Sequence, residues 1–170
     1  MRPSPLAAAA LAVLAAGCAA PLGEEGPPTG AALLDARVER VVDGDTLVAR
    51  AGGERFRVRM LGIDTPESVR PDAPVECFGP EAARRAEQLL PPGTRVRLET
   101  DPTQDRVDDF GRLLAYVVPR AGGEPVNERL VREGFAEVFV FRGREFRRLP
   151  AFAAAERAAR DAGRGLWSRC

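Results

Sequence analysis

The chain has 170 residues, and its 25 basic and 25 acidic side chains give a formal net charge of zero. Every basic residue is arginine, because the sequence contains no lysine and no histidine. This composition excludes a Ser-His-Asp triad, an HExxH zinc site, a Walker-A lysine and a Schiff-base lysine. Carboxylates must therefore carry any acid–base chemistry, and arginines any binding of anions. With 45% hydrophobic and 29% charged residues, the composition is that of a globular protein of about one domain.

The N-terminal region is typical of an exported protein. Residues 1–17 combine one positive charge, at Arg2, with an apolar run that is too short for a membrane-spanning helix. The run ends at Cys18 and resembles a bacterial lipobox, in which the chain is cleaved before the cysteine and its thiol is acylated. Residues 18–32 would then be a lipidated cysteine and a flexible tether rich in proline, glycine and alanine. We expect a cell-envelope lipoprotein, on the outer membrane or the periplasmic face and anchored through Cys18, or a secreted protein if Cys18 carries no lipid.

The other two cysteines agree with export. If Cys18 carries a lipid, Cys77 and Cys170 remain as an even pair in an oxidising compartment, where a disulfide is expected. Such a bridge would tie residue 170 to a loop in the middle of the domain. The alternative is that both cysteines are free thiols.

The domain predicted for residues 33–170 begins with strands. Alternating polar and apolar residues predict strands over 36–42, 46–50 and 54–61, with glycine-rich turns between them. Two further strands are predicted over 94–99 and 113–118, and helices over 79–90, 126–133 and 150–162, which begin or end at proline or glycine. Five strands with interspersed helices predict an α+β fold, dominated by a five-stranded OB-fold barrel with about three helices.

Three charged clusters carry the candidate chemistry, although each alone has an ordinary structural interpretation. Residues 43–46 suit a hairpin turn, residues 59–67 a capped helix start, and residues 108–112 a turn before a strand. Taken together, they offer ligands for a hard divalent cation, which prefers carboxylate and carbonyl oxygens. The candidate ligands are the carboxylates of Asp45 and Asp64 and the carbonyl of Thr65.

The same clusters contain the groups that cleavage of a phosphodiester needs. Glu67 is the candidate base that activates water. Arg59 and Arg112 are the candidate clamps, because a planar guanidinium binds two phosphate oxygens at once and stabilises the charge of a pentacovalent phosphate.

At these residues the sequence resembles the staphylococcal nuclease (thermonuclease) family. The family's motifs occur in family order at Val41–Leu47, Arg59–Glu67, Gly79–Ala82, Asp108–Arg112, Val126–Gly134 and Gly165–Trp167. The resemblance covers about residues 34–168 and implies an OB-fold barrel with three helices. It also implies a calcium-dependent nuclease that cleaves DNA and RNA and leaves 3′-phosphates. We expect nucleic acid as the partner, with single-stranded or frayed substrates preferred, and a monomeric protein.

Carried over position by position, the resemblance assigns a role to each candidate. Asp45, Asp64 and the Thr65 carbonyl become the calcium ligands, and Glu67 becomes the general base.

The arginines and their neighbours are assigned in the same way. Arg59 and Arg112 become the phosphate clamps, Asp108 supports the nucleotide site, and Phe110 is a candidate for contact with the substrate.

The sequence departs from the family's best-known member near the nucleotide. Phe110 stands where that member has tyrosine, Asp109 replaces a lysine, and residues 138–141 contain no tyrosine. A phenyl ring can stack on a base but cannot donate a hydrogen bond to phosphate. We therefore expect catalysis to be retained and tight mononucleotide binding to be weakened. For the aromatic and basic stretch 139–148 we favour a solvated approach to a helix over a rim that binds single strands.

Two other classes of protein are weighed against the nuclease. One is a non-catalytic OB-fold protein of the envelope that binds nucleic acid, and the other is a structural lipoprotein. Because the sequence retains both carboxylate ligands, the base and both clamps, we favour the enzyme. Asn127 is predicted to be a buried structural hydrogen-bonding residue rather than a site residue.

Overall fold

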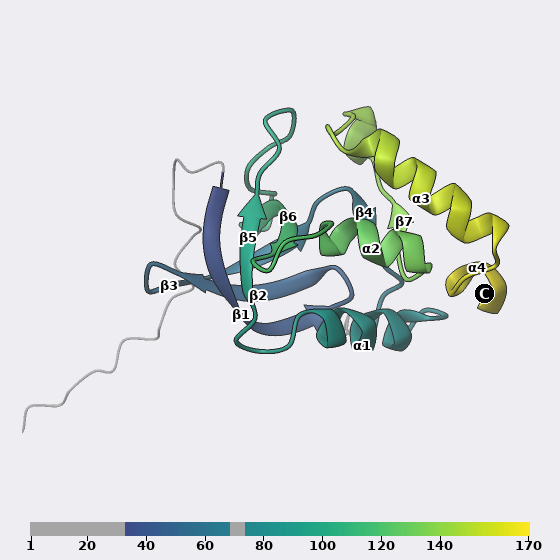
Figure 1. Cartoon of the computed structure of the whole chain (residues 1–170), viewed down its shortest axis with the longest axis horizontal. Helices are drawn as coiled ribbons and strands as arrows, with labels where there is room; N and C mark the ends of the chain where they lie inside the picture. Colours follow the sequence, from purple (N-terminus) through teal and green to yellow (C-terminus); the bar gives the residue numbers. More distant parts are fainter. Residues whose placement is uncertain (1–32, 69–73) are drawn as a thin grey trace, which may run out of the picture.

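The computed structural model describes residues 33–68 and 74–170 of the chain. The predicted signal, Cys18 and the tether lie outside the described residues, so these assignments stay predictions. Among the described residues, no helix has the length and apolar character needed to cross a membrane. In Figure 1 the barrel strands belong mostly to the first two thirds of the chain, and the last third supplies helices.

Five strands close into a barrel (Figure 1). They are β1 (Leu33–Asp43), β2 (Thr46–Ala51), β3 (Glu54–Met60), β5 (Arg95–Glu99) and β6 (Leu113–Pro119). Their order around the barrel is β1-β2-β3-β6-β5, and β5 pairs back to β1. All of these pairs are antiparallel except β3 with β6, which is parallel. The predicted α+β fold with a five-stranded OB-fold barrel is confirmed, and the strand ends differ from the prediction by a few residues.

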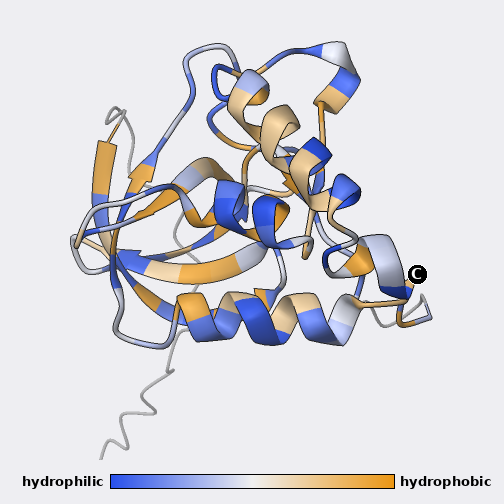
Figure 2. Ribbon diagram, turned by 45° about the vertical axis from the view of Figure 1, so that its right-hand side comes forward, coloured by the Kyte–Doolittle hydropathy of each residue, from blue (hydrophilic) through white to orange (hydrophobic). Residues whose placement is uncertain are grey.

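The alternation of β3 separates the core from the surface. Phe56, Val58 and Met60 are buried in the barrel, and the arginines that alternate with them project from its outer face. Buried residues from the barrel strands and the helices form one hydrophobic cluster. In Figure 2 the barrel strands and the helices all carry both colours, as expected for elements with one face on the core and the other toward solvent.

The three predicted helices are α1 (Gly79–Leu89), α2 (Val126–Glu133) and α3 (Leu149–Asp161). Helix α2 packs against β6, α1 and α3, so it connects the barrel to the rest of the helices. Four short elements were not predicted: β4 (Ile63–Asp64), its partner β7 (Glu137–Val138), the 3₁₀ turn η1 (Phe141–Gly143) and α4 (Leu166–Arg169). Segments of two to four residues are too short to show a hydrophobic period, which is why the sequence pattern missed them.

Asn127 joins α2 to the barrel. Its side chain has no exposed surface. Its amide nitrogen donates to the carbonyls of Leu61 (2.9 Å) and Ala115 (3.2 Å), and its oxygen accepts from the Val117 N–H (2.8 Å). The prediction that Asn127 is a buried structural residue is confirmed.

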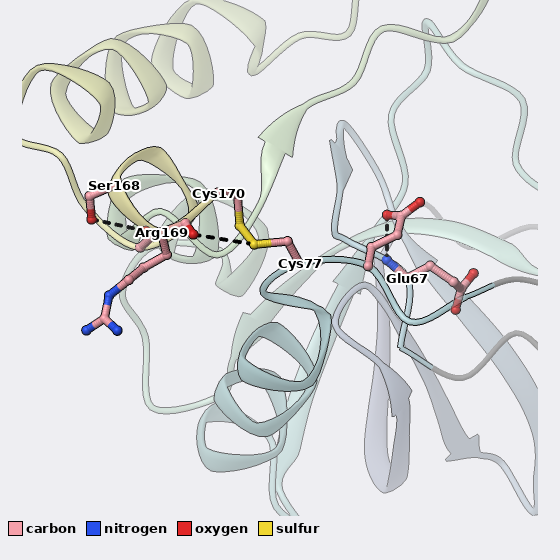
Figure 3. The surroundings of a disulfide bond; sticks show 7 residues. Glu67, Cys77, Ser168, Arg169 and Cys170 are labelled. Atoms are coloured by element: carbon pink, nitrogen blue, oxygen red, sulfur yellow. Dashed lines mark hydrogen bonds between the residues drawn. A yellow bond between two sulfur atoms is a disulfide. The ribbon is translucent and has the colours of Figure 1, made fainter.

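A disulfide joins Cys77 to Cys170, the pair that the sequence analysis expects to be joined (Figure 3). The two Cα atoms are 5.9 Å apart, and 93 positions separate the residues in the sequence. The bond connects the segment that leads into α1 with the end of α4.

Replacing Asn127 with alanine will destabilise the protein. The change leaves the buried Val117 N–H and the Leu61 carbonyl without the Asn127 side chain as a partner, and it removes one of the two donors to the Ala115 carbonyl. We expect it to lower the free energy of unfolding by about 2–4 kcal/mol. Urea unfolding of the two proteins measures the difference. The control is Glu128→Gln on the same helix, expected within about 0.5 kcal/mol of the original. A similarly small effect of Asn127→Ala would contradict the assignment.

Removing the disulfide will also destabilise the protein. In the chain-entropy account, a bridge that closes a loop of this length stabilises by at most about 4–5 kcal/mol, because it restricts the unfolded chain. We expect Cys77→Ser with Cys170→Ser to lower the urea midpoint, and dithiothreitol to lower the midpoint of the original protein to the same value. Equal midpoints with and without the bridge would show that it contributes nothing to stability.

Candidate functional site

One open cleft beside the ends of β2, β3 and β4 gathers the predicted site residues. The cleft has a volume of about 900 Å³. Its lining includes all of the predicted catalytic and metal-binding residues and one of the two predicted substrate residues: Asp45, Arg59, Asp64, Thr65, Glu67, Phe110 and Arg112. The other substrate residue, Asp108, does not line the cleft and instead holds Arg112. The structure thus brings together residues that lie up to 67 positions apart.

Arg59 is the central cation of the cleft. Its side chain is only 14% exposed and lies between two carboxylates. Its Nη1 is 2.8 Å from Oδ2 of Asp45 and donates to the carbonyl of Ile63 (2.9 Å), and its Nη2 donates to Oδ1 of Asp64 (2.7 Å). These contacts fix the guanidinium at the wall of the cleft.

Asp45 connects the β1–β2 turn to the segment after β4. Its Oδ2 accepts from the Thr65 N–H (3.2 Å), and its Oδ1 accepts from the Thr46 hydroxyl (2.9 Å). Gly44 makes this approach possible, because a Cβ at that position would lie 2.7 Å from Oγ1 of Thr65. The hairpin turn that the sequence suggests is therefore also one wall of the site.

The residues proposed as metal ligands fit a hard cation in two ways. Their ligand atoms are oxygens, and one buried hydroxyl oxygen of these residues lacks a hydrogen-bond partner within the described parts of the chain. Asp45 and Thr65 are buried side by side, and Asp64 extends into the cleft. Oγ1 of Thr65 is buried and has no hydrogen-bond partner among the described residues. A buried hydroxyl is costly to leave unsatisfied, so an additional polar group at this position would complete its bonding. Among the described residues, no cluster of three or more carboxylate, histidine or cysteine ligands is present.

Glu67 is held through its backbone by Glu76. The Glu67 N–H donates to Oε2 of Glu76 (2.9 Å), and the Glu76 N–H donates to the Glu67 carbonyl (2.9 Å). Figure 3 shows Glu67 on the chain beside the segment that leads to Cys77 and the disulfide. The Glu67 side chain accepts from the Ser68 N–H (3.1 Å).

Asp43 is a site residue that the sequence analysis took only as part of a turn. Its carboxyl is in hydrogen-bonding contact with that of Glu67 and accepts from the Ser68 hydroxyl (2.6 Å). The one available signal was the first acid of the Asp-Gly-Asp sequence at residues 43–45. The contact between two carboxyls was not predictable, because it depends on how the segment after β4 folds back.

Negative charge is in excess around Arg59. Burial raises the pKa of Asp43, and the contact with Glu67 and the charge of Asp45 add to the rise. Burial also raises the pKa of Asp64, although Arg59 opposes the rise. Both carboxyls are therefore harder to ionise than in water, as expected where acids crowd together without enough cations.

The loop before β6 presents Arg112 and Phe110. Oδ1 of Asp108 accepts from the N–H groups of Phe110 and Arg112 (2.9 Å each), and its Oδ2 accepts from Nε of Arg112 (2.7 Å). Asp108 thus shapes the turn and orients the guanidinium. The ring of Phe110 is beside that guanidinium, 5.2 Å from its carbon, and Phe110 is 80% exposed.

Asp101 anchors this loop to the start of the C-terminal helices, and sequence analysis missed it. Its carboxylate accepts from the Tyr116 hydroxyl (2.5 Å), from the Arg147 N–H (2.8 Å) and from both donors of Thr103. These hydrogen bonds outweigh the effect of burial and lower the pKa of Asp101, whereas burial and Asp101 raise the pKa of Tyr116. A lone Asp in a polar loop gave no signal of this role.

A second, smaller cavity adjoins the cleft and is lined by aromatic rings. Its volume is about 210 Å³, and its lining includes Phe110, Phe139 and Phe141. Phe139 and Phe141 are partly exposed, with ring centres 6.4 Å apart. Residues 139–148 do lead into α3, and their two phenyl rings also line this cavity; the choice between a solvated approach to a helix and a rim that binds single strands stays a prediction.

The family model for the staphylococcal nuclease homologues matches residues 57–169. The chain is 36% identical over 150 residues to the thermonuclease of Staphylococcus hyicus, and the match covers 85% of each protein. It is 36% identical over 137 residues to the SPbeta prophage-derived endonuclease YokF of Bacillus subtilis, covering 81% of this chain and 45% of that protein. It is 34% identical over 137 residues to the endonuclease YncB of the same organism, covering 81% of this chain and 63% of that protein. The chain therefore spans less than two thirds of either Bacillus protein. By its family match and its identity to the thermonuclease, this chain belongs to the family of staphylococcal nuclease homologues.

Proposed function

We propose that this chain is a calcium-dependent nuclease that hydrolyses phosphodiester bonds of DNA and RNA and leaves 3′-phosphate products. The observation that carries the proposal is that one cleft gathers the candidate base, both candidate phosphate clamps and both carboxylates proposed as calcium ligands. The relatives named thermonuclease and endonuclease support hydrolysis of nucleic acid as the reaction.

The residues of the cleft suit the steps of this reaction. Glu67 accepts a proton from water as the water oxygen bonds to phosphorus, and the bond to the 5′-oxygen breaks, with a solvent proton ending on the 5′-hydroxyl. Arg59 and Arg112 stabilise the negative charge that builds on the phosphate oxygens. Since Asp45, Asp64 and Asp108 already hold both guanidinium groups, little reorganisation is needed when that charge develops.

Asp45, Asp64 and the Thr65 carbonyl are the residues that would hold calcium. A bound calcium ion supplies positive charge next to the phosphate and offsets the crowded carboxylates. The surplus of acids around Arg59 and the unsatisfied Thr65 hydroxyl support a cation at this position.

The aromatic cavity supports a preference for single-stranded or frayed substrates. Bases stack on exposed aromatic rings only when they are not already stacked in a duplex. Phe110, Phe139 and Phe141 offer such rings next to the cleft. None of the three has a hydroxyl, so they can hold a base but give no hydrogen bond to a terminal phosphate.

We further propose that the protein acts outside the cytoplasm as a monomer, either anchored through Cys18 or secreted. The lipobox-like sequence and the Cys77–Cys170 disulfide support export.

Glu67→Gln will slow cleavage without abolishing binding. We expect kcat to fall by about 10²–10⁴, because glutamine cannot accept the proton from water.

Arg59→Lys is expected to lower kcat by a similar factor, because an ammonium group cannot bind two oxygens in one plane. Nicking of supercoiled DNA and cleavage of a labelled single strand in calcium measure the rates.

The matched control is Glu81→Gln, which makes the same change on the exposed side of α1 and should cleave at the original rate. Binding of nucleic acid without cleavage by the original protein, under every metal tested, would identify a non-catalytic binding module instead.

Calcium will activate the enzyme only at high concentration. Two carboxylates and a carbonyl form a sparse site, so we expect half-maximal activity at about 10⁻⁴–10⁻³ M calcium. Magnesium should bind but support less activity, because it releases its water ligands reluctantly. Rates measured across a calcium titration in chelator-buffered solution give the midpoint, and a micromolar midpoint would contradict the proposed ligand set.

A further inference from the structure

A row of arginines crosses the outer face of the barrel beside the cleft. Arg57 and Arg59 are two positions apart on β3, so both side chains project from the same face. Arg57 is paired with Val48 on β2, and Val48 is paired with Arg40 on β1. Directly opposed residues of antiparallel strands share a face, so Arg40 and Arg57 flank Val48. Val48 has no exposed surface, as expected for a short side chain between two long ones.

The neighbouring rows of this face have their charges balanced. On one side, Arg59 is paired with Asp45 and Asp64. On the other side, Arg50 and Arg55 both bind Glu39, at 2.7 and 2.9 Å. In contrast, the side chains of Arg40 and Arg57 have no hydrogen bond or ion pair with any of the described residues. They are thus two uncompensated guanidinium groups between two neutralised rows.

Both uncompensated arginines line the same cleft as the candidate active site. The cleft extends from Glu67 and Arg112 to Arg40 and Arg57 without a break. Two residues of a strand span about 7 Å, so the row of Arg57 lies about that far from the row of Arg59. This separation is close to that of consecutive phosphates in an extended single strand.

We propose that Arg40 and Arg57 form a separate phosphate-binding subsite for the backbone of the bound strand, next to the phosphate that is cleaved. The proposal rests on the proposed function, because it takes a nucleic acid strand as the occupant of the cleft. Guanidinium groups that lack carboxylate partners are free to form charge-assisted hydrogen bonds with phosphate. Glu39 neutralises the next row and so ends the subsite on that side.

A phosphate-binding subsite has a measurable consequence that a purely structural role of Arg40 and Arg57 would not have. A substrate too short to reach Arg40 and Arg57 gains nothing from them, whereas a longer strand gains affinity. The ratio of kcat/KM for a long substrate to kcat/KM for a short one therefore reports the subsite. Dependence on salt is a second report, since log K falls with log salt and each lost phosphate contact on a single strand makes that slope less steep by about 0.7.

The variants are Arg40→Met, Arg57→Met and the double variant, because methionine keeps an unbranched apolar stem over Val48 and removes the charge. The matched control is Arg50→Met. It removes one positive charge from the same face of the barrel, but at a position where Glu39 already neutralises the arginine. Thermal unfolding of each variant checks that the barrel is intact. Substrates are labelled single strands of three and of twelve nucleotides, assayed in calcium.

The measured quantity is kcat/KM for the twelve-nucleotide strand divided by kcat/KM for the three-nucleotide strand. We expect Arg40→Met and Arg57→Met each to lower this ratio by about tenfold, and Arg50→Met to leave it unchanged. In chelator, binding of the twelve-nucleotide strand should weaken by a similar factor. An equal loss on both lengths, or the same loss in Arg50→Met, would overturn the subsite.

The binding measurements distinguish failure of the phosphate-binding subsite from failure of the proposed nuclease function. If the original protein cleaves neither substrate but the substitutions weaken binding of the longer strand, the nuclease proposal fails and the subsite stands. If the original protein cleaves both and the substitutions change neither the ratio nor the binding, the subsite fails and the nuclease stands.

Discussion

The site depends on the parallel pairing of β3 with β6. Every other barrel pair is antiparallel, and this one closes the sheet. Arg59 lies opposite Leu114 of β6 in this pair, and Arg112 is only two positions before Leu114, just ahead of the strand. The parallel register thus brings the two phosphate clamps to one edge of the barrel. The hydrogen bonds of Asn127 to Leu61, Ala115 and Val117 hold the same region from the side of α2.

The second constraint is an imbalance of charge that the fold creates and does not resolve. The β1–β2 turn and the segment after β4 bring Asp43, Asp45, Asp64 and Glu67 toward one arginine. Burial raises the pKa of Asp43 and of Asp64, so the folded protein holds acids in an environment that disfavours their charge. Such an arrangement is costly to stability and is typical of functional sites, where a ligand or substrate offsets the charge.

The pattern of polar and apolar residues was sufficient to predict the barrel strands and the three longer helices. The alternation in residues 54–61 predicted both the strand β3 and which of its residues face the core, because a strand has a period of two. The candidate catalytic residues could be named because they lie in compact clusters of charged residues whose chemistry is complementary. The sequence did not predict the contacts that depend on the register between strands or on where the chain reverses direction.

Three arrangements were not predictable: Asp43 against Glu67, Asp101 against Tyr116, and Arg40 and Arg57 on either side of Val48. Each of them joins segments that are distant in the sequence, and no local pattern specifies the pairing. The place of Phe139 and Phe141 beside the small cavity was not predictable for the same reason, since it follows from the two-residue strand β7 and the turn η1.

The positive wall of the cleft has a chemical consequence of its own. Its cations, Arg40, Arg57, Arg59 and Arg112, are all guanidinium groups, and the chain contains no lysine. Acetylation, which silences lysine-based binding surfaces, finds no side-chain amine on this chain. Reagents that acylate lysine side chains therefore have no target in this cleft, and modification of the wall requires chemistry specific for guanidinium groups.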